Sequence, residues 1–596
     1  MEKLRSEINE YDKWNLTDLI KDDSEYQNIV AEIKLLVKKI IDMKGSIVKN
    51  STNLYYYLRT SEELEELESR LYVYSLLYFY SDMQDKIGLN YKNIAENLVE
   101  DIGIKLSFVN SELMSISYDT VKSFINENKN LEKYTFLLEG IYRYQKYILS
   151  ESEEAIIAEA KKAFGTPDDA FSNLDNVDIS LGSIKDSKGK TLELNNFNYA
   201  LCLSSNDSTL RKNAFKAMYK YFKSHINTIS SLYLGSIKED TFSSNVRGFS
   251  SALEESLYSD NINVEFYNNF IEQVHRFLPE LHKYMRLRGK VLGYKNHMYD
   301  LYVDLKPIRT IKLEFNEAKK IILDALSVLG KSYVSDLEKA FNERWIDIYP
   351  NKYKRSGAYE WGAFGVHPFV SVNFTGNIDD VSTLAHELGH AMHTYYANKS
   401  QEMIYAGYPI FLAEIASTVN ETLLNDYLIK HAKTKEEKIN YIGQFLDRVR
   451  TTIYRQTMFA EFEAIMHEEY ALGKTITAEE LNNVYYELNQ RYYGKGIIHD
   501  EEIKYEWARI PHFYTAFYVY KYATGLIAAL SIASDILSND DTAKKKYIEF
   551  LSAGGSDYPL NTLKKVGVDI SDAKTIQKAF GLFKEKLNEL EELIKE

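Results

Sequence analysis

Two histidines and a glutamate stand together in the run HELGH, at residues 386–390. On a helix, His386 and His390 share one face and lie about 6 Å apart along the axis. Both imidazoles then reach one cation at the distance of about 2.0–2.1 Å that zinc requires. The motif predicts a zinc ion held by both histidines, with Glu387 as the base that activates its bound water. The alternative is a pair of ordinary helix histidines, since the motif arises by chance in about one chain in a hundred of this length.

A catalytic zinc keeps three protein ligands and one open position, so a third ligand is required. His393 shares the helix face but lies about 10.5 Å along the axis from the first histidine, too far for one tetrahedral ion. Asp379 and Asp380 precede the helix and are better placed to cap it or to orient a histidine. Glu414 begins a second amphipathic run beside small residues, where an unpaired carboxylate is unusual, so we predict it as the third ligand. Its alternative is a surface glutamate near a helix start, and Glu421, two turns on, is a candidate hydrogen-bond partner for a ligand histidine.

A second unusual segment, WARIPHFYTAFYVYKYATG, runs from residue 507 to residue 525. Hydrolysis of a peptide creates an oxyanion, which a tyrosine hydroxyl or a histidine N–H can stabilise. We predict His512, Tyr514 and Tyr518 as these donors. Because the chain holds 48 tyrosines, the alternative is an aromatic patch of the core.

The elements that must position these residues are mostly helices. Apolar residues recur with helical spacing along much of the chain, for example at Ile29, Ile33, Leu36, Val37, Ile40 and Ile41. We predict a metal helix over 381–397 and a third-ligand helix over 412–428. The β-prone runs WIDIYP, SGAYEWGAFG and HPFVSVNFTG within 345–376 predict a small sheet directly before the metal helix. Residues 163–207, rich in Asn, Asp, Ser and Gly, predict a loop or small-strand region.

The chain has 596 residues, more than the roughly 250–300 of a single core, so two lobes are expected. We place a helical lobe at 1–200 and a catalytic domain at 201–596. Cys202 is the only cysteine, which excludes an internal disulfide and a Cys-rich zinc site.

The net charge of −15 and the lack of a basic block argue against a nucleic-acid partner. The first residues have no apolar core typical of a signal peptide. The longest uncharged run near the end, 522–534, is shorter than the roughly 20 residues that span a bilayer. We therefore expect a soluble, cytoplasmic protein without a membrane partner.

The motifs together resemble a known family. HELGHAMH is followed by AEIAST, which puts Glu414 24 residues after His390. With WNLTDL, SGAYEWG, FTGNIDDVSTLAHELGH and RIPHFYTAFYVYKYATG, the chain resembles the thimet-oligopeptidase-like (M3) zinc metallopeptidases, and among them the oligoendopeptidase F branch. The resemblance covers nearly the whole chain.

This resemblance implies a mainly α fold: a two-lobed helical ellipsoid around a deep substrate channel, with a small antiparallel β-sheet beside the zinc helix. It assigns the metal to His386, His390 and Glu414, the base to Glu387, and donor roles to His512 and tyrosines of 514–522. It also implies that the strand in HPFVSVNF pairs with the substrate backbone. Some relatives carry an acid one turn before the first histidine, where this chain has Ser382, so that histidine must be oriented from elsewhere.

We therefore predict a metalloendopeptidase with one Zn²⁺ per chain that cleaves internal bonds of short unstructured peptides, for which a monomer suffices. One alternative is a zinc carboxypeptidase of related helical fold, which needs a group such as Arg509 to hold a free carboxylate. Another is a non-catalytic peptide-binding module, although only chemistry requires Glu387.

Overall fold

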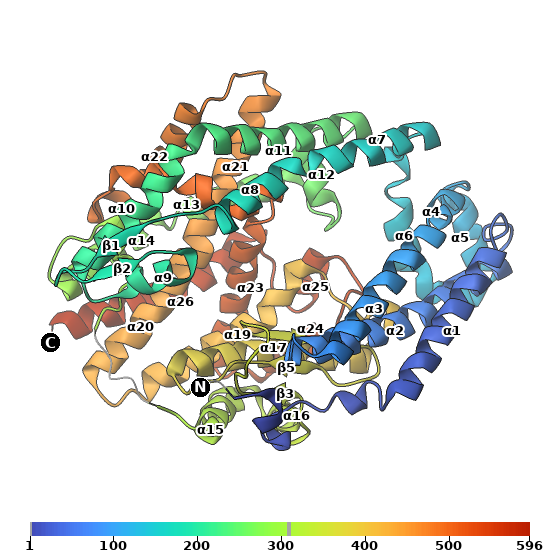
Figure 1. Ribbon diagram of the computed structural model, residues 1–596, viewed down its shortest axis with the longest axis horizontal. Helices are drawn as coiled ribbons and strands as arrows, with labels where there is room; N and C mark the ends of the chain where they lie inside the picture. The colour runs from blue at the N-terminus through green and yellow to red at the C-terminus, as the bar shows by residue number, and fades with distance from the viewer. Residues whose placement is uncertain (1–2, 307–311, 596) are drawn as a thin grey trace. The chain divides into compact units, whose positions relative to one another are not determined.

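The computed structural model describes residues 3–306 and 312–595, apart from the side chains of Glu151 and Lys162, and is mainly helical (Figure 1). Contacts within the chain define two compact units, each assembled from three separate stretches. Unit 1 comprises Met1–Lys146, Thr310–Leu424 and Asp535–Gly567, and unit 2 comprises Tyr147–Arg309, Asn425–Ser534 and Val568–Glu596. The units are interleaved along the chain, whereas the sequence suggested two consecutive parts, 1–200 and 201–596. That division stays a prediction.

Unit 1 consists of helices and one small sheet. The apolar stripe predicted near the amino terminus is confirmed: five of its six residues are buried on the first helix, and Ile41 is half-buried. The helices of unit 1 are α1 (Asp23–Asp42), α2 (Ser51–Ser81), α3 (Lys86–Lys105), α4 (Phe108–Leu113), α5 (Tyr118–Glu127), α6 (Thr135–Tyr142), α15 (Phe315–Leu326), α16 (Lys331–Asn342), α17 (Ile378–Ser400), α18 (Met403–Ala406), the first part of α19 (Ile410–Lys430), α24 (Asp541–Leu551) and α25 (Pro559–Lys565).

The sheet of unit 1 has three short strands, β3 (Ile346–Asp347), β4 (Tyr359–Trp361) and β5 (Phe369–Ser371), in the order β3-β5-β4. They fall in the three β-prone runs, and β4 and β5 contact α17, so the predicted sheet beside the metal helix is confirmed. The prediction that this sheet is antiparallel holds for only one of its two strand pairs. β4 runs antiparallel to β5, but β3 runs parallel to it. The long connection between β3 and β5 lets the chain return in the same direction, which a tight hairpin cannot do.

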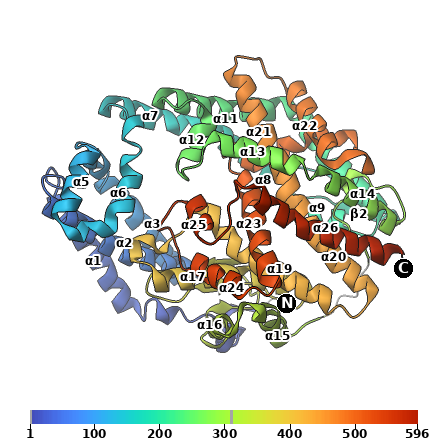
Figure 2. The same cartoon turned by 180° about the vertical axis from the view of Figure 1, so that it is seen from behind.

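Unit 2 packs helices around its own buried aromatic residues. Its helices α11, α21 and α22 lie against one another, as both ribbon views show (Figures 1 and 2). The helices of unit 2 are α7 (Glu151–Phe164), α8 (Thr166–Asn176), α9 (Asn196–Ser204), α10 (Ser208–Ser224), α11 (Ile226–Arg247), α12 (Ala252–Tyr258), α13 (Val264–His275), α14 (Leu278–Leu292), α20 (Lys435–Val449), α21 (Arg455–Ala471), α22 (Ala478–Tyr493), most of α23 (Tyr520–Leu537) and α26 (Ala573–Lys595).

The region 163–207 is more helical than its composition suggests. It contains the end of α7, all of α8 and α9, and one antiparallel hairpin of β1 (Ser183–Lys185) and β2 (Thr191–Glu193). Pro167 stands in the first turn of α8, where its missing N–H costs no hydrogen bond. The prediction of small strands is confirmed for β1 and β2 only, and the prediction of a loop is wrong for α8 and α9.

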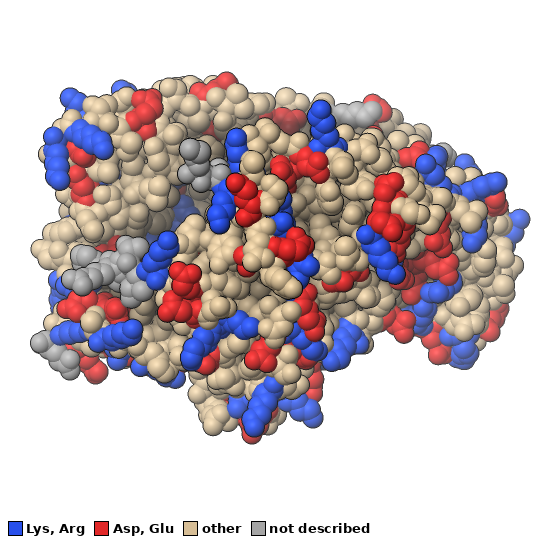
Figure 3. Space-filling view, turned by 60° about the horizontal axis from the view of Figure 1, so that its bottom comes forward, with Lys and Arg blue, Asp and Glu red and all other residues tan. Residues whose placement is uncertain are grey.

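The surface is charged with both signs. Acidic and basic side chains are interspersed over the face seen in Figure 3, a pattern that keeps a surface solvated. Within the described ranges, none of the helices combines the length and the apolar character needed to cross a bilayer. The single cysteine, Cys202, is a buried free thiol.

Candidate metal centre

The HELGH motif lies in the middle of α17, whose start is set by a capping box. Asn377 is the N-cap, and its side chain accepts a hydrogen bond from the backbone N–H of Asp380 at 2.8 Å. The prediction that Asp379 or Asp380 caps the helix is therefore wrong in position. Instead, the Asp380 carboxylate reaches back to the N–H groups of Gly376, at 2.8 Å, and Asn377, at 3.3 Å. Both contacts fix the direction in which α17 leaves the sheet.

One face of α17 packs closely against a second helix, α19, beside the metal motif. Four apolar residues of α17 are fully buried: Leu384, Leu388, Ala391 and Met392. Gly389 allows the closest contact: a Cβ on it would lie 2.4 Å from the Cα of Ser417. Glycine here lets the backbone of α19 come closer than any side chain would allow. The Asn420 amide ties the two helices together by donating to the Ala385 carbonyl at 3.0 Å.

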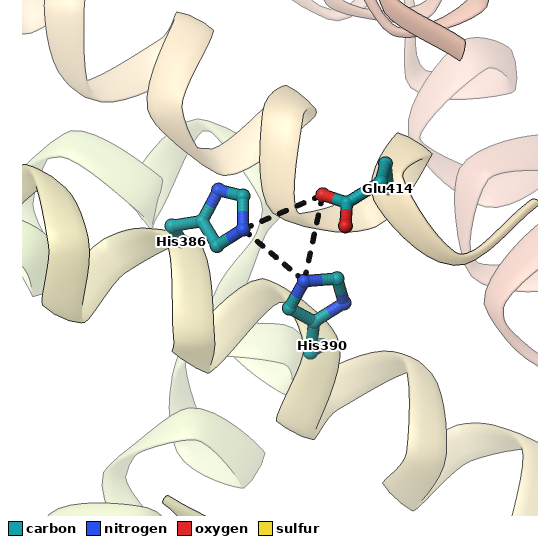
Figure 4. A group of neighbouring side chains, drawn as sticks. All are labelled: His386, His390 and Glu414. Carbon is teal, nitrogen blue, oxygen red and sulfur yellow. Dashed lines mark hydrogen bonds and ion pairs between the residues drawn. The ribbon is translucent and has the colours of Figure 1, made fainter. Parts of the chain in front are cut away.

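The crossing of α17 and α19 brings three predicted ligands together (Figure 4). The Nε2 atoms of His386 and His390 are 3.2 Å apart, and Oε2 of Glu414 lies 3.4 Å from the first and 3.6 Å from the second. Atoms that bind one tetrahedral zinc at about 2.0–2.2 Å are themselves about 3.3–3.6 Å apart. Two imidazoles and a carboxylate are also a ligand set that zinc accepts. The spacing and the chemistry of the three donors therefore fit this metal.

The carboxylate of Glu414 has its own support. The Ser417 hydroxyl donates to Oε2 of Glu414 at 3.2 Å. The Glu414 side chain is 44% exposed, whereas those of His386 and His390 are 26% and 15% exposed. The ligand atoms thus sit on protein at one side and remain accessible at the other, as an open coordination position requires.

Glu421 fixes the orientation of the first histidine. Its carboxylate oxygen lies 2.5 Å from Nδ1 of His386, so Glu421 reaches a histidine that we predict as a ligand. A proton on Nδ1 leaves Nε2 as the metal-binding nitrogen. Burial alone would lower the pKa of His386, but the hydrogen bond that it donates to Glu421 and the nearby carboxylates raise that pKa. Glu421 supplies the acid that is missing at Ser382.

The segment 507–525 belongs to unit 2 and brings together only part of the predicted donor set. Nε2 of His512 lies 3.2 Å from the Tyr522 hydroxyl, and the ring of Tyr518 is 6.1 Å from that of His512 and 5.3 Å from that of Tyr522. Tyr514 is turned elsewhere: it stacks on Phe171 at 4.6 Å, and its buried hydroxyl has no hydrogen-bond partner among the described residues. Burial lowers the pKa of His512, and Arg455 adds to the effect, so its imidazole tends to the neutral form.

A strained turn separates these aromatic rings. The segment passes from one short 3-10 helix, Pro511–Tyr514, into α23 through Phe517, whose φ of 56° is left-handed. The Phe517 N–H donates to the buried carboxyl of Glu463 at 3.1 Å, which anchors the turn. Burial raises the pKa of Glu463 well above its usual range. Glu463 thus stabilises the backbone one residue before Tyr518.

Comparison with known proteins identifies the chain. Residues 201–582 match the model of peptidase family M3, and residues 112–180 match that of oligopeptidase F. The chain belongs to peptidase family M3. It is 39% identical to oligopeptidase PepF of Bacillus subtilis, covering 99% of this chain and 88% of that protein. It is 36% identical to group B oligopeptidase PepB of Streptococcus agalactiae, covering 99% and 98%.

Solved structures agree with this assignment. The fold matches oligoendopeptidase-F from Enterococcus faecium with a TM-score of 0.74 and 32% identity, covering 96% of this chain and 99% of that one. A structure from Chlamydophila abortus matches with a TM-score of 0.92 and 36% identity over the full length of both chains. The chain is thus a metalloendopeptidase, and the resemblance seen in its motifs is confirmed.

In this M3 peptidase the predicted base, Glu387, lies near the predicted ligands His386 and Glu414 and is 7% exposed. Burial raises its pKa to about 7; His386 opposes that rise, and Glu414 and Glu421 add to it. A second acid, Glu360 on β4, is close enough to sense Glu387: burial raises the pKa of Glu360 to about 8, and the charge of Glu387 adds to the rise. The sequence gives no signal for Glu360, because a three-residue strand has no measurable period.

His393 does not join the three predicted ligands. Its ring is fully buried and stacks on Tyr408 with centroids 3.7 Å apart. Burial lowers the pKa of His393 to about 3, so it packs as a neutral aromatic ring. This position agrees with the helical spacing that excluded it as a third ligand.

Proposed function

We propose that this M3 peptidase is a zinc-dependent endopeptidase that cleaves internal bonds of short, unstructured peptides. The observation that carries the proposal is the triangle of ligand atoms on His386, His390 and Glu414, with sides of 3.2, 3.4 and 3.6 Å. The names of the relatives, which include oligopeptidases and oligoendopeptidases, support short peptides as substrates.

The three ligand side chains would hold the ion, and Glu421 would keep the His386 ring in its binding orientation. Zinc bound there supplies Lewis acidity that polarises the scissile carbonyl. Glu387 is buried and close enough to His386 and Glu414 for their charges to act on its carboxyl, so it would serve the reaction without being a ligand. It takes a proton from the attacking water and passes it to the nitrogen of the leaving amine.

The oxyanion needs hydrogen-bond donors from the protein. We assign this role to His512 and Tyr518, because their rings form one cluster with Tyr522 in unit 2. Tyr514 was an equal candidate on sequence grounds. Its ring packs on Phe171, away from this cluster, and this favours Tyr518 over it.

The substrate backbone also needs a partner. The expectation that β5 pairs with it is wrong for residues 369–371, because β5 is the central strand, with β3 on one edge and β4 on the other. β4, at the edge of the sheet and in contact with α17, is the strand better placed for such pairing.

Product mapping tests the proposal. Zinc-reconstituted protein is incubated with a set of unstructured peptides of roughly ten residues and with one folded protein, and the products are identified by mass spectrometry. We expect cuts at internal bonds of the peptides and none in the folded protein. Stepwise loss of carboxyl-terminal residues would favour a carboxypeptidase, and capture of intact peptides would favour a binding module.

A further inference from the structure

Unit 2 contains a cavity of about 360 Å³ beside His512 that the proposed reaction leaves unused. The size lies within the range of sites that hold small ligands or one end of a longer one. Most of its wall is aromatic or apolar, formed by residues such as Tyr199, Phe215, Tyr219, Met298, Tyr302 and Phe459. Three fully charged side chains also line it: Arg455, Glu506 and Arg509. What the cavity binds depends on how these charges balance.

Glu506 is the one carboxylate among the described residues of the wall, and both of its oxygens are hydrogen-bonded. Oε1 of Glu506 accepts a hydrogen bond from Arg455 at 2.5 Å, and Oε2 accepts one from the Tyr485 hydroxyl at 2.5 Å. Burial works against the ionised form, yet Arg455 and these hydrogen bonds hold the pKa of Glu506 below its usual range. The Arg455–Glu506 pair is therefore neutral overall, and each oxygen of the carboxylate already accepts a hydrogen bond.

Arg509 is the charge that remains. Among the described residues, its guanidinium has no hydrogen-bond partner and no ion-pair partner within 4 Å. The guanidinium stacks over the Tyr199 ring, 5.0 Å from the ring centroid. The charge of Arg509 also acts on the carboxyl of Asp175. Burial raises the pKa of Asp175, and Arg509 offsets only part of that rise. Glu506 also attracts Arg509 electrostatically, from beyond ion-pair distance. Because no described carboxylate contacts the guanidinium, its burial is costly unless a ligand supplies an anion.

We propose that this cavity binds a carboxylate group of the peptide substrate, with Arg509 as the ion-pair partner. The planar guanidinium presents two parallel N–H donors that match the two oxygens of a carboxylate. The aromatic wall receives the side chain beside that group. Two sources share this chemistry: the terminal carboxylate of the peptide and the side chain of an internal Asp or Glu.

The inference rests on the proposed function, because His512 lines the cavity and is also a proposed oxyanion donor. A peptide held by Arg509 at one end would lie with its scissile bond near that donor. Binding of a carboxylate away from the scissile bond would select peptides by the position of that carboxylate, and neither the metal ligands nor Glu387 can make this selection.

The test uses one nonapeptide in three forms: a free carboxyl terminus without acidic side chains, the same peptide amidated, and the amidated peptide with one internal Glu. KM and kcat are measured for the zinc-loaded wild type, Arg509→Gln and the control Arg286→Gln, which removes an exposed guanidinium of α14.

We expect KM for at least one carboxylate form to be about tenfold or more below that of the plain amide. In Arg509→Gln this advantage is lost, while kcat for the plain amide stays within about twofold. Arg286→Gln behaves as the wild type.

The form that shows the advantage identifies the source of the carboxylate. Equal KM values for all three forms in the wild type would overturn the inference, and so would an Arg509→Gln variant that weakens all three alike, as a purely structural role predicts. If Arg509→Gln unfolds, Arg509→Lys is used instead, because it keeps a cation and should keep part of the KM advantage. A rise in KM for the plain amide in Arg509→Lys would also count against the site.

Failure of the proposed function has a different signature. Calorimetric titration of zinc-loaded Glu387→Ala with the three peptides measures binding without turnover. Arg509-dependent binding of a carboxylate form, together with no cleavage by the wild type, would overturn the peptidase proposal and leave the carboxylate site standing. Cleavage with no preference for a carboxylate would overturn the carboxylate site and leave the peptidase proposal standing.

Discussion

The imidazole of His386 is held at both of its nitrogens. Nε2 faces His390 and Glu414, and Nδ1 hydrogen-bonds Glu421 at 2.5 Å. We predict that Glu421→Gln weakens zinc binding by about 10- to 100-fold, because the neutral amide is a poorer partner for the Nδ1 proton. Titration against a competing chelator measures the affinity. Glu343→Gln, at an exposed position in unit 1, is the matched control. Unchanged affinity in Glu421→Gln would exclude the orienting role.

Two tyrosines four residues apart should behave differently when their hydroxyls are removed. Tyr518→Phe should lower kcat by about 10²- to 10³-fold, the cost of losing one oxyanion donor. Tyr514→Phe should change kcat by less than about threefold, since the ring still packs on Phe171 and its hydroxyl has no partner among the described residues. Steady-state kinetics on one peptide decides between them. The opposite order of effects would reverse the assignment.

The residues that could be predicted from the sequence are those with helical spacing. His386 and His390 are one turn apart, and Glu421 follows Glu414 by two turns, so one face of each helix carries the candidate site. The choice among tyrosines could not be made in the same way. The segment is a short 3-10 helix followed by the left-handed turn at Phe517, and no single period runs through it.

At the scale of elements, the contact between α17 and α19 decides whether three ligands meet. Gly389→Ala would place a Cβ 2.4 Å from the Cα of Ser417 and 2.7 Å from the Ala416 carbonyl oxygen. We predict a loss of about 1–3 kcal/mol in the free energy of unfolding, as for other overpacked sites, together with weaker zinc binding. Thermal unfolding and zinc titration measure the two effects.

Gly103→Ala is the control for this change. Gly103 also lies within a helix of unit 1, but a Cβ there meets no atom within 4 Å. Alanine should be neutral or stabilise the helix by up to about 1 kcal/mol. If both variants bound zinc as the wild type does, the close helix contact would not position the third ligand.

Some elements were hidden by composition. The Asn- and Asp-rich stretch before β1 suggested a loop, but α8 carries Pro167 in its first turn and buries Phe171. The mixed sheet was missed because local β-propensity does not encode which strands pair. Ile346 pairs with Val370 across a connection of more than twenty residues, and only tertiary packing selects that register.

At the scale of the whole molecule, each unit is assembled from distant stretches. In unit 1, Arg5 forms an ion pair with the buried Asp347, which also pairs with the buried Lys354 at 2.7 Å. Such contacts join the amino terminus to the sheet before the metal helix. Residue spacing carries no information about pairs so far apart, so the interleaving of the units could not be predicted from the sequence.

Zinc should contribute to the stability of the folded chain, because the unfolded chain has no preformed site. A ligand present at about 1,000 times its Kd adds about 4.1 kcal/mol to the free energy of unfolding. Removing zinc with a chelator should therefore lower Tm, and restoring zinc should recover it. His386→Ala should start at the lower Tm and not respond to the chelator. A wild-type Tm that is insensitive to zinc would argue against a resident ion.

The most direct test of the account compares the wild type with Glu387→Ala at known metal content. Both proteins are reconstituted, their zinc is quantified, and kcat/KM is measured on one peptide with an internal cleavage site. We predict about one zinc per chain in each protein and a fall in kcat/KM of at least about 10²- to 10⁴-fold in the variant, because the base is lost and the ligands are not. A variant that holds zinc and keeps most of its turnover would contradict the role of Glu387 and the mechanism built on it.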